Sequence, residues 1–174
     1  MEQYTEYPDS YVEYLALFHG SRDYFECHEV MEEYWKEQGD TAYKPIWHGL
    51  IQVAVALYHQ RRGNQRGAEK MMASALNNLR GQPVSELGMD GSTLLETLAR
   101  RLEAINAQAP YEPLHLPLSD PRLSATIAEL TGGGDSRYAP EDENAPAIRD
   151  KHLVRDRSEV VAQRLAAWER RRRS

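Results

Sequence analysis

Residues 45–62 read PIWHGLIQVAVALYHQRR, and this stretch decides the fold. Placed on a helix at 100° per residue, its apolar side chains cover most of the circumference, which is typical of a helix buried among other helices. Pro45 suits the first turn of that helix, which we expect to continue to Arg62 before Gly63. Up to residue 59, the polar exceptions fall on one stripe of the helix: His48, Gln52 and His59.

Helical periodicity continues on both sides of this stretch. Further helices are predicted over residues 10–19, 22–36, 65–80 and from 92 to about 105. Residues 110–118 contain three prolines, which disfavour helix in the residues before them, so we expect an extended strap here. A short helix follows, from about 119 to 131. No alternation of apolar and polar residues is long enough to indicate a sheet. The predicted fold is all-α: an antiparallel helical bundle of about five core helices with a strap and a C-terminal helix.

Composition sets the class of protein. Of the 174 residues, 41% are hydrophobic and 28% are charged, which is typical of a globular chain. We predict a bundle domain over 1–131, a linker rich in Gly, Pro, Asp and Glu over 132–149, and a basic C-terminal helix over 150–174.

The longest apolar-rich stretch is too short for a bilayer, and MEQYTEYPDS lacks the features of a secretory signal. The single cysteine excludes an internal disulfide. We therefore expect a cytoplasmic protein without membrane contact.

Charge is distributed unevenly along the chain. Residues 149–174 contain nine Lys or Arg and four acidic residues, a net charge of +5, so the remaining 148 residues carry −11. The basic segment could contact an anionic partner such as RNA, or it could fold back on the acidic body, and the second alternative is favoured. Its end lacks interleaved aromatic residues, so we expect no capacity to read bases. The residues that would contact an anion are Arg170, Arg171, Arg172 and Arg173.

Two inward-facing polar residues mark the second predicted helix. On a helical wheel His28 lies at the centre of the apolar arc and Glu32 lies nearby, inside it. Glu29 lies on the border of that arc. The opposite side, where solvated charges belong, carries Arg22, Glu26, Glu33 and Glu37. A buried carboxylate requires a partner, so Glu32 is expected to have one.

Consecutive helices with short connections are antiparallel neighbours, so the stripe on the third helix can face this pair. The expected polar cluster, a candidate ligand-binding site, consists of His28, Glu29, Glu32, Gln52 and His59. Two imidazoles and a carboxylate suit a divalent iron, manganese or zinc ion, and the candidate metal ligands are His28, Glu32 and His59, with His48 as an alternative to His59. The chain has no HExxH motif and lacks the Glu-x-x-His pairs of di-iron bundles.

A structural interpretation stays open beside the functional one. The stripe could be the solvent-exposed side of the third helix, with His28 a core histidine bonded to Glu32. Nothing in the sequence indicates a nucleotide-binding loop or an activated nucleophile. Whether the chain is an enzyme, an oligomer or a non-enzymatic interaction protein acting through its basic C-terminal helix is also open.

Three segments together carry a resemblance to a known family. YFECHEVMEEYWK at 24–36, HGLIQVAVALYH at 48–59, and Gly63-Asn64 followed by Gly67-Ala68 resemble domain-of-unknown-function family 309. The likeness covers roughly residues 11–80. It implies a small all-α fold of packed antiparallel helices, typical of bacterial and archaeal cytosolic proteins, and it implies no activity. The family motif maps onto His28, Glu29, Glu32, Gly49, Gln52, His59, Gly63 and Asn64. His48 stands where the family usually has Gln, which makes His48 a poor candidate for a shared role.

Overall fold

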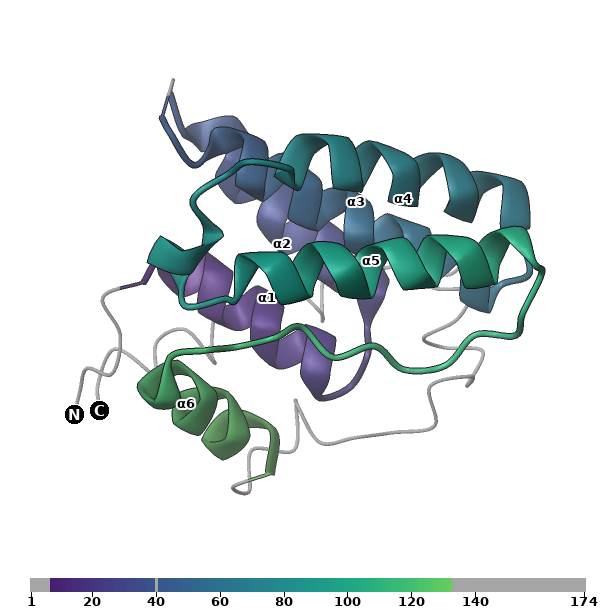
Figure 1. Ribbon diagram of the computed structural model, residues 1–174. Coiled ribbons are helices and arrows are strands. Elements are labelled where there is room, and N and C mark those ends of the chain that lie inside the picture. The colour runs from purple at the N-terminus through teal and green to yellow at the C-terminus, as the bar shows by residue number, and fades with distance from the viewer. Residues whose placement is uncertain (1–6, 40, 133–174) are drawn as a thin grey trace.

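The computed structural model describes residues 7–39 and 41–132, and this part of the chain is helical (Figure 1). The prediction of an all-α fold is confirmed. Within the described ranges, the only β-bridge is an isolated one that joins Met89 and Leu118. The helices in chain order are α1 (Asp9–His19), α2 (Tyr24–Glu37), α3 (Lys44–Arg61), α4 (Gln65–Leu79), the 3-10 turn η1 (Val84–Leu87), α5 (Gly91–Asn106) and α6 (Pro121–Gly132).

Side-chain caps fix where three of the helices begin. The Asp23 carboxylate accepts from Glu26 N at 3.1 Å, the Asn64 amide oxygen accepts from Gly67 N at 3.0 Å, and Asp90 accepts from Thr93 N at 3.2 Å. Such oxygens satisfy backbone donors that the first helical turn leaves unpaired. The predicted starts of α2 at residue 22 and of α5 at residue 92 lie two residues and one residue from the observed starts. Serine, present at 21 and 92, is as favourable a capping residue type as aspartate, so residue type alone does not fix the start. The turn η1 was not predicted.

The central helix of the bundle is α3, which packs most extensively against α4 and α2. Ile46, Leu50, Val53 and Leu57 are completely buried, as the apolar run from 45 to 62 predicted. The approach of α4 is close at Gly49, where an added Cβ would lie 2.6 Å from Leu79 Cγ. Glycine therefore sets the spacing of these two helices.

Aromatic side chains of α1 fill the space beneath α3. Tyr11 and Tyr14 are completely buried, and their hydroxyls donate to Leu87 O at 2.7 Å and Leu50 O at 2.6 Å. Burial raises the pKa of both phenols, so these hydroxyls remain protonated donors. Each buried polar tip thus has a partner, which permits large side chains at the centre of the fold.

Residues 107–120, between α5 and α6, form the strap that the prolines predicted. In Figure 1 the strap crosses α1 between α5 and α6. Leu114 and Leu116 are buried, and the backbone N of Asp90 donates to Pro117 O at 3.0 Å. The strap then leads into α6, which packs on α1.

Two charged residues expected in solvent are buried instead. Arg22 and Glu26 are 7% and 3% exposed, so the prediction of a solvated face was wrong for them, whereas Glu33 and Glu37 are exposed as expected. Arg22 precedes the N-cap of α2 and has φ +61°, so helical periodicity does not apply to it. Glu26 is buried because α2 packs against α1 as well as α3, and two neighbours cover more than one face.

The predicted C-terminal helix and nearly all of the predicted linker lie outside the described residues. Among the described helices, none is both long and apolar enough to cross a bilayer.

Candidate functional site

A small pocket opens between the first half of α2 and the last turns of α3. Its volume is about 260 Å³, slightly below the usual range for drug-sized ligands. Most of its wall is apolar or aromatic, with polar groups from two histidines and one arginine. The lining residues are Tyr24, Phe25, His28, Val55, Tyr58, His59 and Arg62.

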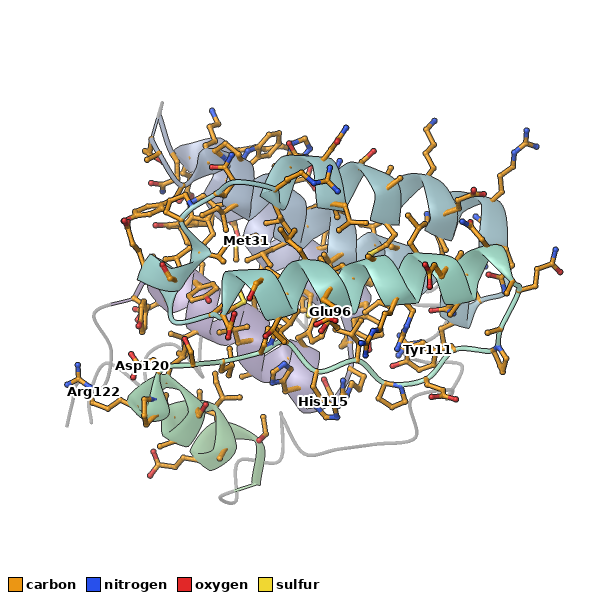
Figure 2. All side chains as sticks on the ribbon, in the orientation of Figure 1. Met31, Glu96, Tyr111, His115, Asp120 and Arg122 are labelled. Carbon is orange, nitrogen blue, oxygen red and sulfur yellow. The ribbon has the colours of Figure 1, made fainter. Side chains whose placement is uncertain are left out.

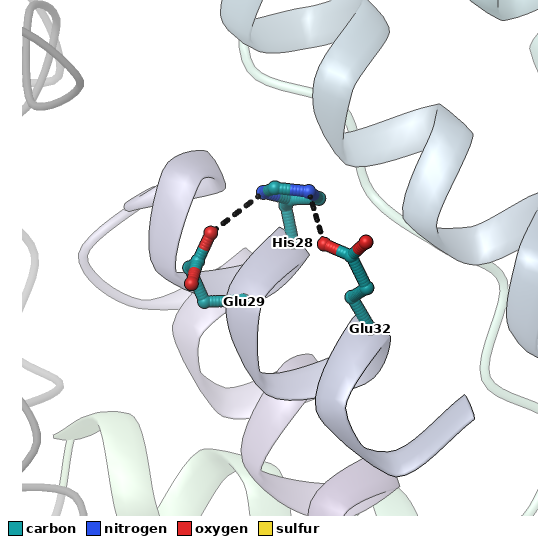
Figure 3. A group of neighbouring side chains, drawn as sticks. All are labelled: His28, Glu29 and Glu32. Carbon is teal, nitrogen blue, oxygen red and sulfur yellow. Dashed lines mark ion pairs between the residues drawn. The ribbon is translucent and has the colours of Figure 1, made fainter. Parts of the chain in front are cut away.

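On the α2 side of the pocket, His28 lies between two carboxylates. Its Nδ1 is 3.3 Å from Glu29 Oε2, and its Nε2 is 2.8 Å from Glu32 Oε1. Figure 3 shows the two carboxylates on opposite sides of the ring. The three side chains are 25%, 30% and 33% exposed, so the group is half-buried and open to solutes. His28 is therefore at the edge of the core and not at its centre, because the fully buried arc of α2 includes Cys27 and Met31.

On the α3 side, a helix cap orients His59. Asn64 accepts from Gly67 N through Oδ1, so its Nδ2 is the atom that faces His59 Nδ1, at 3.3 Å. An amide nitrogen can only donate, so Nδ1 of a neutral His59 accepts and Nε2 carries the proton. A Cβ on Gly67 would lie 2.7 Å from Asn64 Nδ2 and 3.0 Å from His59 Cδ2, so only glycine leaves room for this contact.

The other half of the α3 stripe has different neighbours. His48 stacks on Trp35 of α2, with ring centroids 4.8 Å apart. Gln52 accepts from Asn78 Nδ2 of α4 at 2.6 Å. Of the five residues expected to cluster, the structure brings His28, Glu29 and Glu32 together and places His59 in the same pocket as His28, whereas Gln52 is bonded to α4.

Sequence reasoning missed a second polar group, which we call the strap cluster: His19, Arg22, Tyr24, Arg61 and Tyr111. Arg61 Nη1 donates to Arg22 O at 2.8 Å, and Arg22 Nη1 donates to Leu114 O at 2.6 Å. The Arg61 guanidinium lies over the Tyr24 ring at 4.6 Å and the Tyr111 ring at 5.5 Å, and Figure 2 shows Tyr111 and His115 on the strap. The members of the strap cluster come from segments far apart in the chain, so no local spacing in the sequence indicates this cluster.

Cysteine chemistry is absent from the pocket. Cys27 is completely buried, and its thiol donates to Tyr14 O at 3.6 Å. Burial, with the nearby carboxylates of Asp23 and Glu26, raises the pKa of this thiol, so it is not an activated nucleophile. The residues predicted to contact an anion at the chain end, Arg170, Arg171, Arg172 and Arg173, lie outside the described residues.

Comparison with known proteins places this arrangement in a family. The family model described as "Domain of unknown function (DUF309)" matches residues 11–71. The chain is also 40% identical over 171 residues to "Uncharacterized protein YpuF" of Bacillus subtilis (strain 168), covering 97% of this chain and 98% of that protein. The chain belongs to the DUF309 family. No solved structure matches it.

The residues that carry the likeness to DUF309 have distinct physical roles. Gly49 allows α4 to approach α3, and Gly63, with φ +86°, ends α3 in a conformation that favours glycine. Asn64 caps α4 and holds His59. The backbone motif at the α3–α4 turn thus orients one wall of the pocket, while the His-Glu pattern of α2 forms the other.

Proposed function

We propose that the pocket between α2 and α3 binds a small, partly apolar anion. The single observation that carries this proposal is the convergence of His59 and Arg62 on one apolar pocket, which His28 also lines. An apolar cavity with a few directed polar groups is the usual form of a small-molecule site. The volume suits a compact ligand with one ring or a short aliphatic chain.

The sign of the ligand charge follows from the two polar groups on α3. His59, held by Asn64, offers an N–H donor at Nε2 in its neutral form. Arg62 is permanently charged, and its guanidinium lies over the Tyr58 ring at 5.6 Å. Two donors on one wall, one of them a cation, favour a carboxylate or phosphate over a neutral ligand.

Amide chemical shifts measured during titration test this proposal. Benzoate and phenyl phosphate are the probes, and benzamide is the matched neutral compound. We expect the two anions to shift amide resonances near residues 24–28 and 55–62, and benzamide to shift them much less. Arg62→Gln should weaken anion binding about tenfold. Arg66→Gln, on an exposed position of α4, makes the same charge change away from the pocket and should leave binding unchanged.

Equal shifts from benzoate and benzamide would contradict the anionic assignment. Shifts confined to other parts of the chain would contradict the pocket itself.

The charge asymmetry of the chain supports a second proposal, that the basic C-terminal segment contacts an anionic partner. This would make the chain an interaction protein and does not require the pocket. Replacing Arg170, Arg171, Arg172 and Arg173 by Gln should then reduce retention on an RNA column at moderate salt. Unchanged retention would exclude a contribution from these residues.

A further inference from the structure

Each ring nitrogen of His28 lies beside a carboxylate: Nδ1 is 3.3 Å from Glu29 Oε2, and Nε2 is 2.8 Å from Glu32 Oε1. A neutral imidazole carries a proton on one nitrogen and a lone pair on the other, so one of the two nitrogens faces a carboxylate without a proton between them. A second cation beside the ring, either a proton or a metal ion, relieves that repulsion.

The spacing of these atoms fits two ligands of one metal ion. Zinc lies about 2.0–2.2 Å from imidazole nitrogen or carboxylate oxygen. Two such ligands at angles of about 90–110° lie roughly 2.8–3.5 Å apart, and the observed 2.8 Å is at the short end of that range. Residues four apart on a helix share one face, so α2 presents both atoms to the same point without a backbone change.

Glu29 can be the acceptor that a metal-binding histidine usually has for its second ring nitrogen. Such a histidine donates its second ring N–H to a carboxylate or carbonyl, which fixes the tautomer and orients the ring. Glu29 occupies this position, 3.3 Å from Nδ1 and on the opposite side of the ring from Glu32 (Figure 3). His28, Glu29 and Glu32 each offer one ligand atom within 4.8 Å of the others, but the geometry separates a ligand pair from an orienting carboxylate.

We propose that His28 Nε2 and the Glu32 carboxylate bind a divalent transition-metal ion, with Zn²⁺ as the type case, and that Glu29 orients the ring. A nitrogen and an oxygen donor favour Zn²⁺ or Mn²⁺ over Ca²⁺ and Mg²⁺, which take oxygen ligands. His59 is not a ligand in this proposal, because Nδ1 accepts from Asn64 and Nε2 carries the proton. The side chains of His28 and Glu32 are 25% and 33% exposed, so water can fill the remaining coordination positions.

Lys36 is a positive charge that would compete with the metal ion for the Glu32 carboxylate. Its Nζ lies 3.4 Å from Glu32 Oε2, on a side chain that is 66% exposed. The ammonium group competes for the same carboxylate, so its removal should strengthen metal binding. A purely structural cluster binds no zinc with or without Lys36, so a gain in zinc affinity on removing Lys36 is expected only if the metal site exists.

The metal site shares a wall with the proposed ligand pocket but does not depend on it. Zinc affinity is measured with no organic ligand present, whereas the benzoate titration is performed without metal. Val55→Trp fills the pocket and should abolish benzoate binding while leaving zinc affinity unchanged. The two proposals therefore fail separately.

Competition with a chromophoric zinc chelator tests the proposal on the full-length chain, prepared without a histidine tag. We expect one Zn²⁺ per chain. His28→Ala should weaken its binding at least about 30-fold and Glu32→Gln at least about tenfold, since each removes a ligand. Glu29→Gln should weaken it roughly 10- to 100-fold by releasing the ring, and Lys36→Met should strengthen it severalfold.

Two other histidines serve as controls. His115 is exposed on the strap, and His115→Ala should leave the affinity unchanged. His59→Ala should change it less than about threefold. The proposal is overturned if zinc does not bind below about 100 µM, a Kd that corresponds to roughly −5.5 kcal/mol. It is also overturned if His28→Ala binds as tightly as the wild type, or if Lys36→Met weakens binding. A loss in His59→Ala equal to that in His28→Ala would overturn the assigned ligand pair.

Discussion

Arg61 and Arg62 are adjacent in sequence but belong to two different polar regions. Arg61 is 7% exposed and contacts the strap cluster, with its donor Nη1 on a backbone carbonyl and its guanidinium over two tyrosine rings. Arg62 is half-buried and lines the pocket. In the first region Arg61, Arg22 and His19 each make a hydrogen bond to the protein's own backbone. In the second, side chains with directed polar groups surround a space.

The difference teaches how to distinguish a polar cluster that holds the fold from one that can bind a ligand. The strap cluster connects α1, α2, α3 and the strap through bonds to Arg22 O, Leu114 O and the backbone N of Leu116. The polar residues of the pocket, which we call the pocket group, are His28, His59 and Arg62. His28 contacts carboxylates of its own helix, and His59 contacts Asn64 of the α3–α4 turn. We therefore expect substitutions in the strap cluster to change stability, and those in the pocket group to change binding.

The largest expected effect is the loss of Arg61. Arg61→Ala removes a charge-assisted hydrogen bond to Arg22 O, which keeps Tyr24 N as a donor, and it also removes the stacking on Tyr24. We expect a loss of about 3–4 kcal/mol in the free energy of unfolding. Urea denaturation measures it. Arg62→Ala is the matched control and should cost less than about 1 kcal/mol. Equal losses would remove the distinction between the two regions.

Acidification should loosen the strap through His19. Burial, with smaller contributions from Arg22 and His115, lowers the pKa of His19 from 6.5 to about 4, and its Nε2 accepts from Leu116 N at 3.1 Å. Because the pKa is lower in the folded state, the unfolded chain takes up this proton first. The stabilisation is complete above about pH 6.5 and is lost between pH 6.5 and pH 4, by about 3 kcal/mol in total.

Denaturation curves between pH 7 and pH 4 measure this loss. His19→Gln removes the titrating group and should flatten the pH dependence in this interval. His115→Gln, at an exposed neighbouring position, should leave most of the pH dependence of stability in place. A His19→Gln profile identical to that of the wild type would assign the acid sensitivity to other groups.

A smaller effect separates helix capping from pocket geometry at Asn64. Asn64→Ala should cost about 1 kcal/mol, because the first turn of α4 loses its side-chain acceptor. Asn64→Asp keeps that acceptor but places a carboxylate beside His59 Nδ1, which favours the other tautomer. We therefore expect Asn64→Asp to retain stability and to lose benzoate affinity. Ring ¹⁵N chemical shifts report the tautomer directly, and an unchanged tautomer would contradict this account of His59.

The smallest expected effect on stability is at His28. His28 contacts carboxylates of its own helix and is partly exposed, so His28→Ala should change the free energy of unfolding by less than about 1 kcal/mol. A loss of 2 kcal/mol or more, in the range of a lost buried hydrogen bond, with no change in zinc or benzoate binding, would favour the structural interpretation of the cluster. Thermal unfolding together with the two titrations decides between these outcomes.

The sequence predicted much of the fold because the information was local. The apolar circumference of residues 45–62 identified the central helix, Asn64 and Gly63 marked the α3–α4 turn, and three prolines marked the strap. Residues four apart on one helix must share a face, so the pairing of His28 with Glu32 also follows from spacing alone.

Tertiary structure decided what depends on contacts between distant segments. Three features join elements that no periodicity relates: the burial of Arg22 and Glu26, the contact of Arg61 with the Tyr24 and Tyr111 rings, and the bond from Asn78 to Gln52. The orientation of His59 combines both levels, since a local cap fixes the Asn64 amide and helix packing brings the imidazole to the pocket. Sequence alone determined which helices form and which polar residues lie side by side on them. Only the packing of those helices decided which polar groups hold the strap and which face a pocket, because burial is a property of the assembled neighbours and not of one helix.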